Sequence, residues 1–106
     1  MLIYCAHKYG GLERNKQDAE DKIKHLQTND PENTYISPIH AFGHLYSDVS
    51  YDKGMEMCFD LLAVCDCMVV LRDTSEGVRR EIEYANTHNI PITDAYATAS
   101  GQPPAQ

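Results

Sequence analysis

A serine, a glycine and a carboxylate at the start of one helix carry the clearest chemical signal in this sequence. Ser75, Gly77 and Glu81 follow directly on the short apolar run 68–71, and the segment 75–85 opens an amphipathic helix. The start of a helix presents free backbone N–H groups that favour an anion, and a carboxylate on the inner side of that helix can act on a bound ligand. The pattern therefore predicts a ligand site where this strand passes into this helix.

The phase of this helix decides which of its carboxylates faces the site. At about 100° per residue, Val78, Ile82 and Ala85 fall within one narrow apolar stripe. Glu81 lies on the flank of that stripe, whereas Glu83 lies on the far side. We therefore expect Glu81 to face inward, either as a site residue or as a carboxylate at the edge of a packed helix.

Size and charge restrict the classes of function. The chain has 106 residues, which is enough for one compact domain, and its net charge is -7. Such an acidic chain is not expected to bind a nucleic acid polymer or an acidic membrane. The sequence shows no signal peptide, and its apolar runs are far shorter than the roughly 20 residues that cross a bilayer. We expect a soluble, cytoplasmic protein.

The four cysteines favour the same compartment. Cys5, Cys58, Cys65 and Cys67 fall in or beside apolar segments, which is typical of reduced, buried thiols. Although Cys65 and Cys67 would share one face of a strand, no second pair of ligands has the spacing of a zinc site. We expect neither a disulfide nor a metal.

The elements that position these residues alternate between strand and helix. Apolar patterns predict strands at 2–6, 34–37, 68–71 and 90–92, and helices after Gly11, from 51 to 64 and from about 75. We expect Asn15 to cap the first helix and 38–50 to form a long loop. Residues 1–95 would form the domain, and 96–106 a disordered tail.

This order predicts an α/β fold, a flavodoxin-like or Rossmann-like three-layer sandwich with a short parallel sheet of four to five strands. If the strand order is 2-1-3-4, the ligand crevice lies between the first and third strands, beyond their carboxyl ends. The loops that meet there contain further candidate ligand-binding residues, namely His7, Tyr9, Gly10, Gly11, His40 and Asp48. His7 points into or away from the crevice, His40 is a ligand contact or an ordinary loop histidine, and Ser75 is a helix cap, an anion contact or both.

Three motifs in this order resemble a known family of enzymes. The motifs are Ile3-Tyr4 leading to Gly10-Gly11, Cys65-Asp66 before the buried strand, and Ser75-x-Gly77-Val78-x-x-Glu81 ending in Tyr84-Ala85. They are similar to the nucleoside 2-deoxyribosyltransferase and 2'-deoxynucleoside 5'-phosphate N-hydrolase superfamily, and within it to a branch of small bacterial and phage proteins.

The resemblance implies cleavage of the N-glycosidic bond of a nucleoside or nucleotide, or transfer of its (deoxy)ribose. Glu81 would be the nucleophile that attacks the anomeric carbon, and Tyr4 would orient it. Ser75 and the glycines of the first loop would hold a 5'-phosphate. The resemblance further implies a homodimer or larger homo-oligomer, and neither cofactor nor metal is needed.

The sequence departs from this family at one important position. The family carries an aspartate in the helix before the buried strand, and the matching residue here is about Cys58. Asp48, Asp52 or Glu56 could supply the second carboxylate from nearer the crevice, and we select Asp52 as the catalytic candidate. A nucleotide-binding module with little or no turnover is the alternative, and an interaction domain with a vestigial crevice is a third.

Overall fold

The sheet of this protein consists of parallel strands in the order β2-β1-β3-β4. The computed structural model describes residues 1–72 and 75–94. The elements follow the order β1 (Leu2–Ala6), α1 (Glu13–Asn29), β2 (Thr34–Ile36), α2 (Pro38–Phe42), the 3-10 helix η1 (Gly43–Leu45), α3 (Tyr51–Ala63), β3 (Cys67–Val70), α4 (Glu76–Thr87) and β4 (Ile92–Asp94). The predicted α/β class is confirmed, and the strands have the order for which the crevice is expected beyond β1 and β3.

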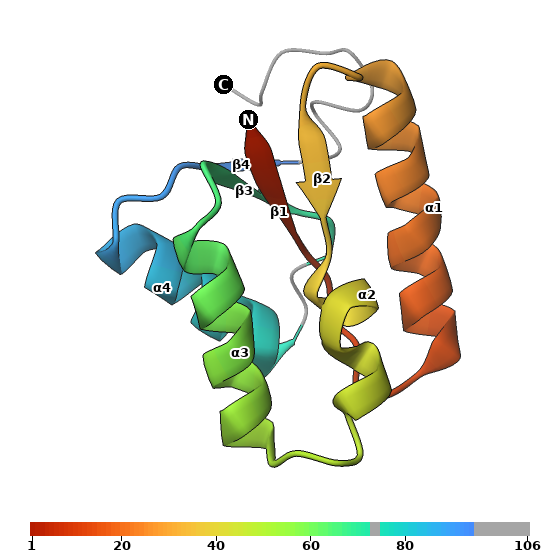
Figure 1. Ribbon diagram of the computed structural model, residues 1–106, viewed down its shortest axis with the longest axis vertical. Coiled ribbons are helices and arrows are strands. Elements are labelled where there is room, and N and C mark those ends of the chain that lie inside the picture. Colours follow the sequence, from red (N-terminus) through yellow and green to blue (C-terminus); the bar gives the residue numbers. More distant parts are fainter. Residues whose placement is uncertain (73–74, 95–106) are drawn as a thin grey trace.

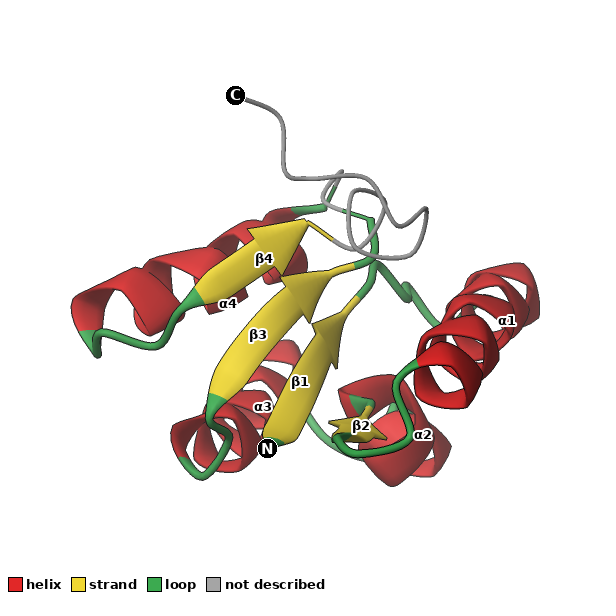
Figure 2. Cartoon of the chain, turned by 90° about the horizontal axis from the view of Figure 1, so that it is seen from above, coloured by secondary structure: helices red, strands yellow, loops and turns green. Residues whose placement is uncertain are grey.

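Helices cover both faces of this sheet. Figures 1 and 2 show α1 on one side of the strands, and α3 and α4 together on the other. Successive residues of a strand point to opposite faces, so Cys5 packs with α1 in one core cluster. Tyr4 packs with residues of α3 and α4 in the other. This alternation brings Tyr4 to the face of the sheet that also carries α4.

The segment 38–50 contains two short helices, so the prediction of a long loop was wrong. Ser37 is the N-cap of α2, where its Oγ accepts a hydrogen bond from the backbone N–H of His40 at 3.3 Å. Pro38 occupies the first helical turn, where its missing N–H costs nothing. The helix η1 follows directly at Gly43.

The prediction that Asn15 caps the first helix was also wrong. The helix α1 begins at Glu13, and its N-cap is Leu12, which is extended and provides no side-chain hydrogen bond. Asn15 lies inside the first turn, and its side-chain amide donates to the carbonyl of Tyr9 at 2.8 Å. The turn before α1 is thus closed by a side chain that reaches back across it.

The expectations for the cysteines, for membrane-spanning helices and for the segment 96–106 can be compared with the structure in turn. All four cysteines have free thiols. In the described ranges, no helix combines the length and the apolar character that crossing a membrane requires. The proposed tail, residues 96–106, lies outside the described residues.

Candidate active site

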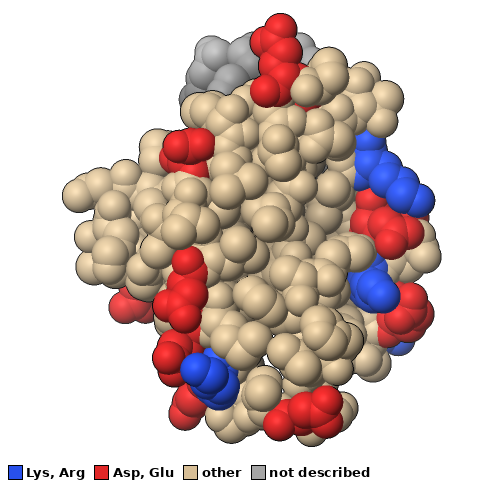
Figure 3. Space-filling view, in the orientation of Figure 1, with Lys and Arg blue, Asp and Glu red and all other residues tan. Residues whose placement is uncertain are grey.

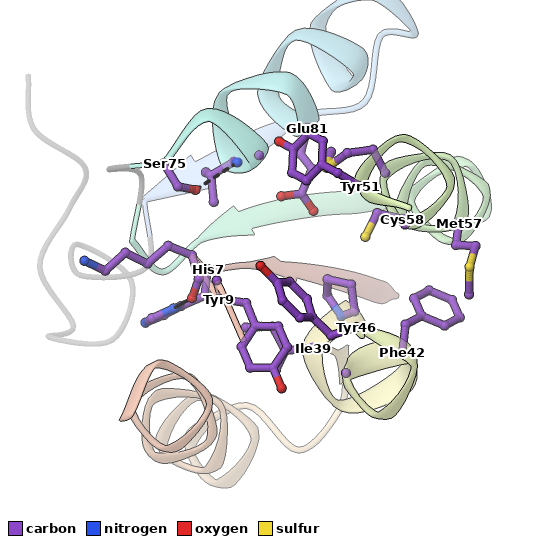
Figure 4. A pocket seen from close by; sticks show the side chains of 18 of the residues that line it. His7, Tyr9, Ile39, Phe42, Tyr46, Tyr51, Met57, Cys58, Ser75 and Glu81 are labelled. Carbon is purple, nitrogen blue, oxygen red and sulfur yellow. Dashed lines mark hydrogen bonds between the residues drawn. The ribbon is translucent and has the colours of Figure 1, made fainter. Parts of the chain in front are cut away.

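A cavity of about 620 Å³ opens beyond the carboxyl end of β1, where α2, η1 and the first turns of α3 and α4 meet. This volume is within the range of small-molecule sites, which are lined mostly by apolar side chains with a few polar groups. The same composition is found here, and Figure 4 shows Tyr9, Ile39 and Tyr46 across the pocket from Ser75 and Glu81. In Figure 3, the acidic and basic side chains lie toward the margins of one face, with uncharged surface between them.

Glu81 and Tyr4 form a buried pair at the wall of this pocket. Glu81 borders the cavity and is only 5 % exposed, so the prediction that it faces inward is confirmed. Tyr4 is fully buried, and its hydroxyl donates a hydrogen bond to the Glu81 carboxylate. Burial raises the pKa of Glu81 to about 7, although the hydrogen bond from Tyr4 acts in the opposite direction. Glu81 therefore exists in both protonation states near neutral pH.

Cys58 lies beside this pair on α3 and borders the pocket. Burial, together with the nearby charge of Glu81, raises the pKa of its thiol to about 11. The Tyr4 pKa lies well above its ordinary value for the same two reasons. At neutral pH, Cys58 and Tyr4 are therefore both protonated, and Glu81 is the ionisable member of this group.

The start of α4 forms the next part of the wall. The Ser75 Oγ caps the helix by accepting from the Val78 backbone N–H at 3.2 Å. Gly77 lies against α3, where an added Cβ would make ordinary contact with the Tyr51 hydroxyl oxygen at 3.6 Å. Arg80 lies over the Tyr51 ring, 5.5 Å from its centroid. The wall thus combines a helix N-terminus with an aromatic ring that a cation covers.

Two glycines shape the loop after β1. Gly10 and Gly11 have φ values of +61° and +73°, which residues other than glycine rarely adopt. A Cβ on Gly11 would also lie 2.8 Å from the Tyr46 ring. Tyr46 in turn meets Tyr9 edge to face, with ring centroids 5.2 Å apart. We call Tyr9, Tyr46 and the neighbouring Leu12, which also borders the cavity, the aromatic corner.

His7 holds this loop against α1. Its imidazole is fully buried, with Nδ1 at 2.6 Å from the Lys8 carbonyl oxygen and Nε2 at 2.6 Å from a carboxylate oxygen of Asp18. Both partners are acceptors, so the ring donates to both only when each nitrogen carries a hydrogen. Hydrogen bonds from His7 and Lys22 lower the Asp18 pKa. His7 borders the pocket, but its polar atoms face away from it.

The structure brings together some of the predicted site residues and leaves others outside. Those that border the cavity are Glu81, His7, Tyr9, Gly10, Cys58, Ser75 and Gly77, and Tyr4 lies directly behind Glu81. Those that do not border it are Gly11, His40, Asp48 and Asp52.

The suggested second carboxylates all lie in exposed positions. The side chain of Asp52 is 89 % exposed, and its carboxylate lies 3.7 Å from Arg80. Glu56 is paired with Lys53 at the surface, and Asp48 is exposed. His40, outside the pocket as well, contacts Ser37 and Glu20. Among the described residues, the other carboxylate that borders the cavity besides Glu81 is Glu76, in the first turn of α4.

The sequence reasoning missed the residues that give the pocket its shape. Tyr46, Phe42 and Ile39 come from the segment 38–50, for which the sequence predicts a loop, and Asn15 is the residue that the sequence predicts as a cap. The dipeptide Ser37-Pro38 was a usable signal, because serine at the N-cap and proline in the first turn favour a helix start. No comparable signal in the sequence marks Asn15 as part of the pocket.

These features define a small α/β protein with a ligand pocket beyond the carboxyl ends of a parallel sheet. The chain belongs to the family described as a domain of unknown function (DUF7768), whose model matches residues 1–95. No curated protein and no solved structure matches the chain.

Proposed function

We propose that this protein cleaves the N-glycosidic bond of a nucleoside or nucleotide, or transfers its (deoxy)ribose, with Glu81 as the nucleophile. The observation that carries the proposal is the buried pair of Tyr4 and Glu81 at the wall of a cavity of about 620 Å³. A carboxylate held by a tyrosine in an apolar pocket is suited to attack on carbon, because burial removes the water that would weaken it as a nucleophile.

The reaction follows the pattern of retaining glycosidases. The Glu81 carboxylate forms a bond to the anomeric carbon as the bond from that carbon to the base nitrogen breaks, and the base leaves with the electron pair and takes up a proton. Water or a second base then attacks the anomeric carbon and releases Glu81. Attack requires the ionised carboxylate, so with a Glu81 pKa of about 7 the rate should rise with pH through this range.

The polar groups near the pocket suit the rest of a nucleotide. Lys8 and the backbone of α4 around Ser75 and Gly77 border the cavity and can hold a 5'-phosphate. Apolar and aromatic walls suit a flat base. We further propose that the protein forms a homo-oligomer. We also propose that it is cytoplasmic, because its four free thiols are typical of a reducing compartment.

Chromatographic detection of free base tests this function. The protein is incubated with a mixture of nucleosides and 5'-nucleotides, and the Glu81→Gln variant is expected to release no base while it still binds ligand. Glu83→Gln is the matched control, because Glu83 is on the same helix but exposed. Equal base release by the unsubstituted protein and Glu81→Gln would exclude the covalent mechanism.

A nucleotide-binding module without turnover is the second candidate, and one observation favours it. The three carboxylates that the sequence suggests for assisting the departing base, Asp48, Asp52 and Glu56, are all exposed and outside the pocket, and Glu76, which borders the pocket, is exposed as well. General acid assistance contributes about 10²–10⁴-fold to such rates, so a pocket without it binds more readily than it reacts. Tight binding of nucleotides with no release of base would establish this function.

A further inference from the structure

Asn15 is a nearly buried amide that has one unused hydrogen-bonding atom at the pocket. Asn15 is 7 % exposed and borders the cavity. The amide nitrogen donates to the Tyr9 carbonyl at 2.8 Å, which fixes the orientation of the amide because a carbonyl oxygen accepts only from the nitrogen side. The carbonyl oxygen, Oδ1, therefore points away from Tyr9.

This oxygen is free to accept a hydrogen bond. Asn15 Oδ1 has no hydrogen-bond partner among the described residues. Within the same residues, every side-chain oxygen or nitrogen that is fully buried has a hydrogen-bond partner. Oδ1 is therefore accessible, and the accessible space that Asn15 borders is the cavity. An acceptor held rigidly in a mostly apolar pocket is costly to leave unpaired when a ligand displaces water from it.

The surroundings of Asn15 indicate what the ligand presents to it. Its backbone N–H donates to the carbonyl of Leu12 at 3.0 Å, and its amide holds Tyr9, so it lies at the aromatic corner. Tyr46 completes this corner by its edge-to-face contact with Tyr9. A flat ring packs well against such apolar and aromatic surfaces, whereas a sugar or phosphate would lose hydrogen bonds with water there.

We propose that the aromatic corner binds the base and that Asn15 Oδ1 accepts a hydrogen bond from an N–H group on its edge. This inference rests on the proposed function only in taking the ligand to be a nucleoside or nucleotide, and it does not require turnover. It makes Asn15 a residue that selects among bases, in a part of the pocket separate from the pair of Tyr4 and Glu81.

The test is a cycle that changes both the protein and the ligand. Affinities are measured by calorimetry on Glu81→Gln, which is expected to bind without turnover, for nucleosides paired with analogues in which one N–H donor group is removed or blocked. The pairs are adenosine with purine riboside, guanosine with inosine, cytidine with pyrimidin-2-one riboside, and thymidine with N3-methylthymidine. The same titrations are repeated with Asn15→Leu added, or with Asn15→Ala added if the leucine variant does not fold.

One pair is expected to show a preference of about fivefold to tenfold for the nucleoside with the N–H group, the usual effect of one neutral hydrogen bond. The Asn15 substitution should abolish this preference, whereas loss of its contact with the Tyr9 carbonyl should change the affinities for both members of the pair to the same extent. Gln17→Leu removes an exposed amide from the same helix and should keep the preference.

Three results would overturn the proposal. A preference that survives the Asn15 substitution would assign recognition to another residue, and an equal loss for both members of every pair would mean that Asn15 only supports the Tyr9 loop. If no nucleoside or nucleotide binds, this proposal and the proposed function fail together. If the Asn15 substitution abolishes the preference but the unsubstituted protein releases no base, the role of Asn15 is supported and only catalysis is contradicted.

Discussion

The α4 side of the pocket and the aromatic corner opposite it differ in what fixes their geometry. On the α4 side, Ser75 caps the helix that carries Glu81, so the cap and the helical repeat set their relative positions. In the corner, Tyr9 and Tyr46 come from segments far apart in the chain and are fitted together by ring contacts and by Gly11. The relative placement of Ser75 and Glu81 is thus encoded locally, whereas the shape that would receive a ligand depends on tertiary packing.

The largest expected effect of a substitution is on the α4 side. Because the folded state raises the Glu81 pKa from 4.5 to about 7, the unfolded chain loses this proton more readily. The contribution of Glu81 to the free energy of unfolding should therefore fall as pH rises from about 4.5 to 7 and stay constant above that range. Since glutamine does not ionise, Glu81→Gln should be more stable than the unsubstituted protein at pH 8.5 by on the order of 3 kcal/mol.

Urea unfolding at pH 8.5 and pH 4 measures this effect. At the lower pH the two proteins should differ little, because Glu81 is then protonated in both the folded and the unfolded state. A stability difference that does not change with pH would show that Glu81 is not held in the apolar environment described above.

The next largest effect is expected in the corner. Gly11→Ala forces a side chain into a left-handed backbone conformation and places its Cβ 2.8 Å from the Tyr46 ring. We expect a loss of about 2 kcal/mol in stability and weaker binding of nucleosides, measured by thermal unfolding and calorimetry. Gly10→Ala is a close control, because its φ is +61° but nothing lies within 4 Å of the added Cβ. Equal ligand affinities in the two variants would mean that Tyr46 does not contact the ligand.

A third substitution adds chemistry to the α4 side. Cys58→Asp places a carboxyl group beside Tyr4 and Glu81, where the resemblance to the deoxyribosyltransferases implies an aspartate. We expect release of base to rise by about tenfold, toward the lower end of general acid catalysis. Cys58→Asn has a similar size but no carboxyl proton to give, so it should not accelerate the reaction. If both variants are equally fast or slow, the missing aspartate does not limit turnover.

The smallest effect concerns the cap of α4. Ser75→Ala removes the acceptor for the Val78 N–H and should lower stability by about 1 kcal/mol. It should also reduce the preference for a 5'-monophosphate over its nucleoside by about the value of one hydrogen bond. Ser37→Ala, which removes the cap of α2, should cost similar stability but keep the preference. An unchanged preference in Ser75→Ala would restrict Ser75 to capping.

Local periodicity allowed the parallel α/β sheet and the inward direction of Glu81 to be predicted. Both depend on regular geometry, namely the right-handed crossover and the helical repeat. The pair of Tyr4 and Glu81 was expected only from the family resemblance, because two residues so far apart in the chain meet only when the sheet and α4 have packed.

The sequence did not predict the position of Asn15, the helices of 38–50 or the exposure of Asp52. Asparagine before an acidic turn is commonly a cap, but Asn15 reaches back to the Tyr9 carbonyl from within the helix. The segment 38–50 lacks an apolar period because its helices are too short to show one. The exposed position of Asp52 follows from its place at the start of α3, where Ser50 rather than Asp52 provides the cap.

The position of Cys58 makes occupancy of the pocket measurable without knowledge of the ligand. Of the four thiols, Cys58 is the one that borders the cavity, whereas Cys5, Cys65 and Cys67 are buried. With a pKa of about 11, its alkylation is slow at neutral pH and accelerates as pH rises. A small alkylating reagent therefore gives a footprint of the empty pocket, and any metabolite that slows labelling of Cys58 reveals itself as an occupant.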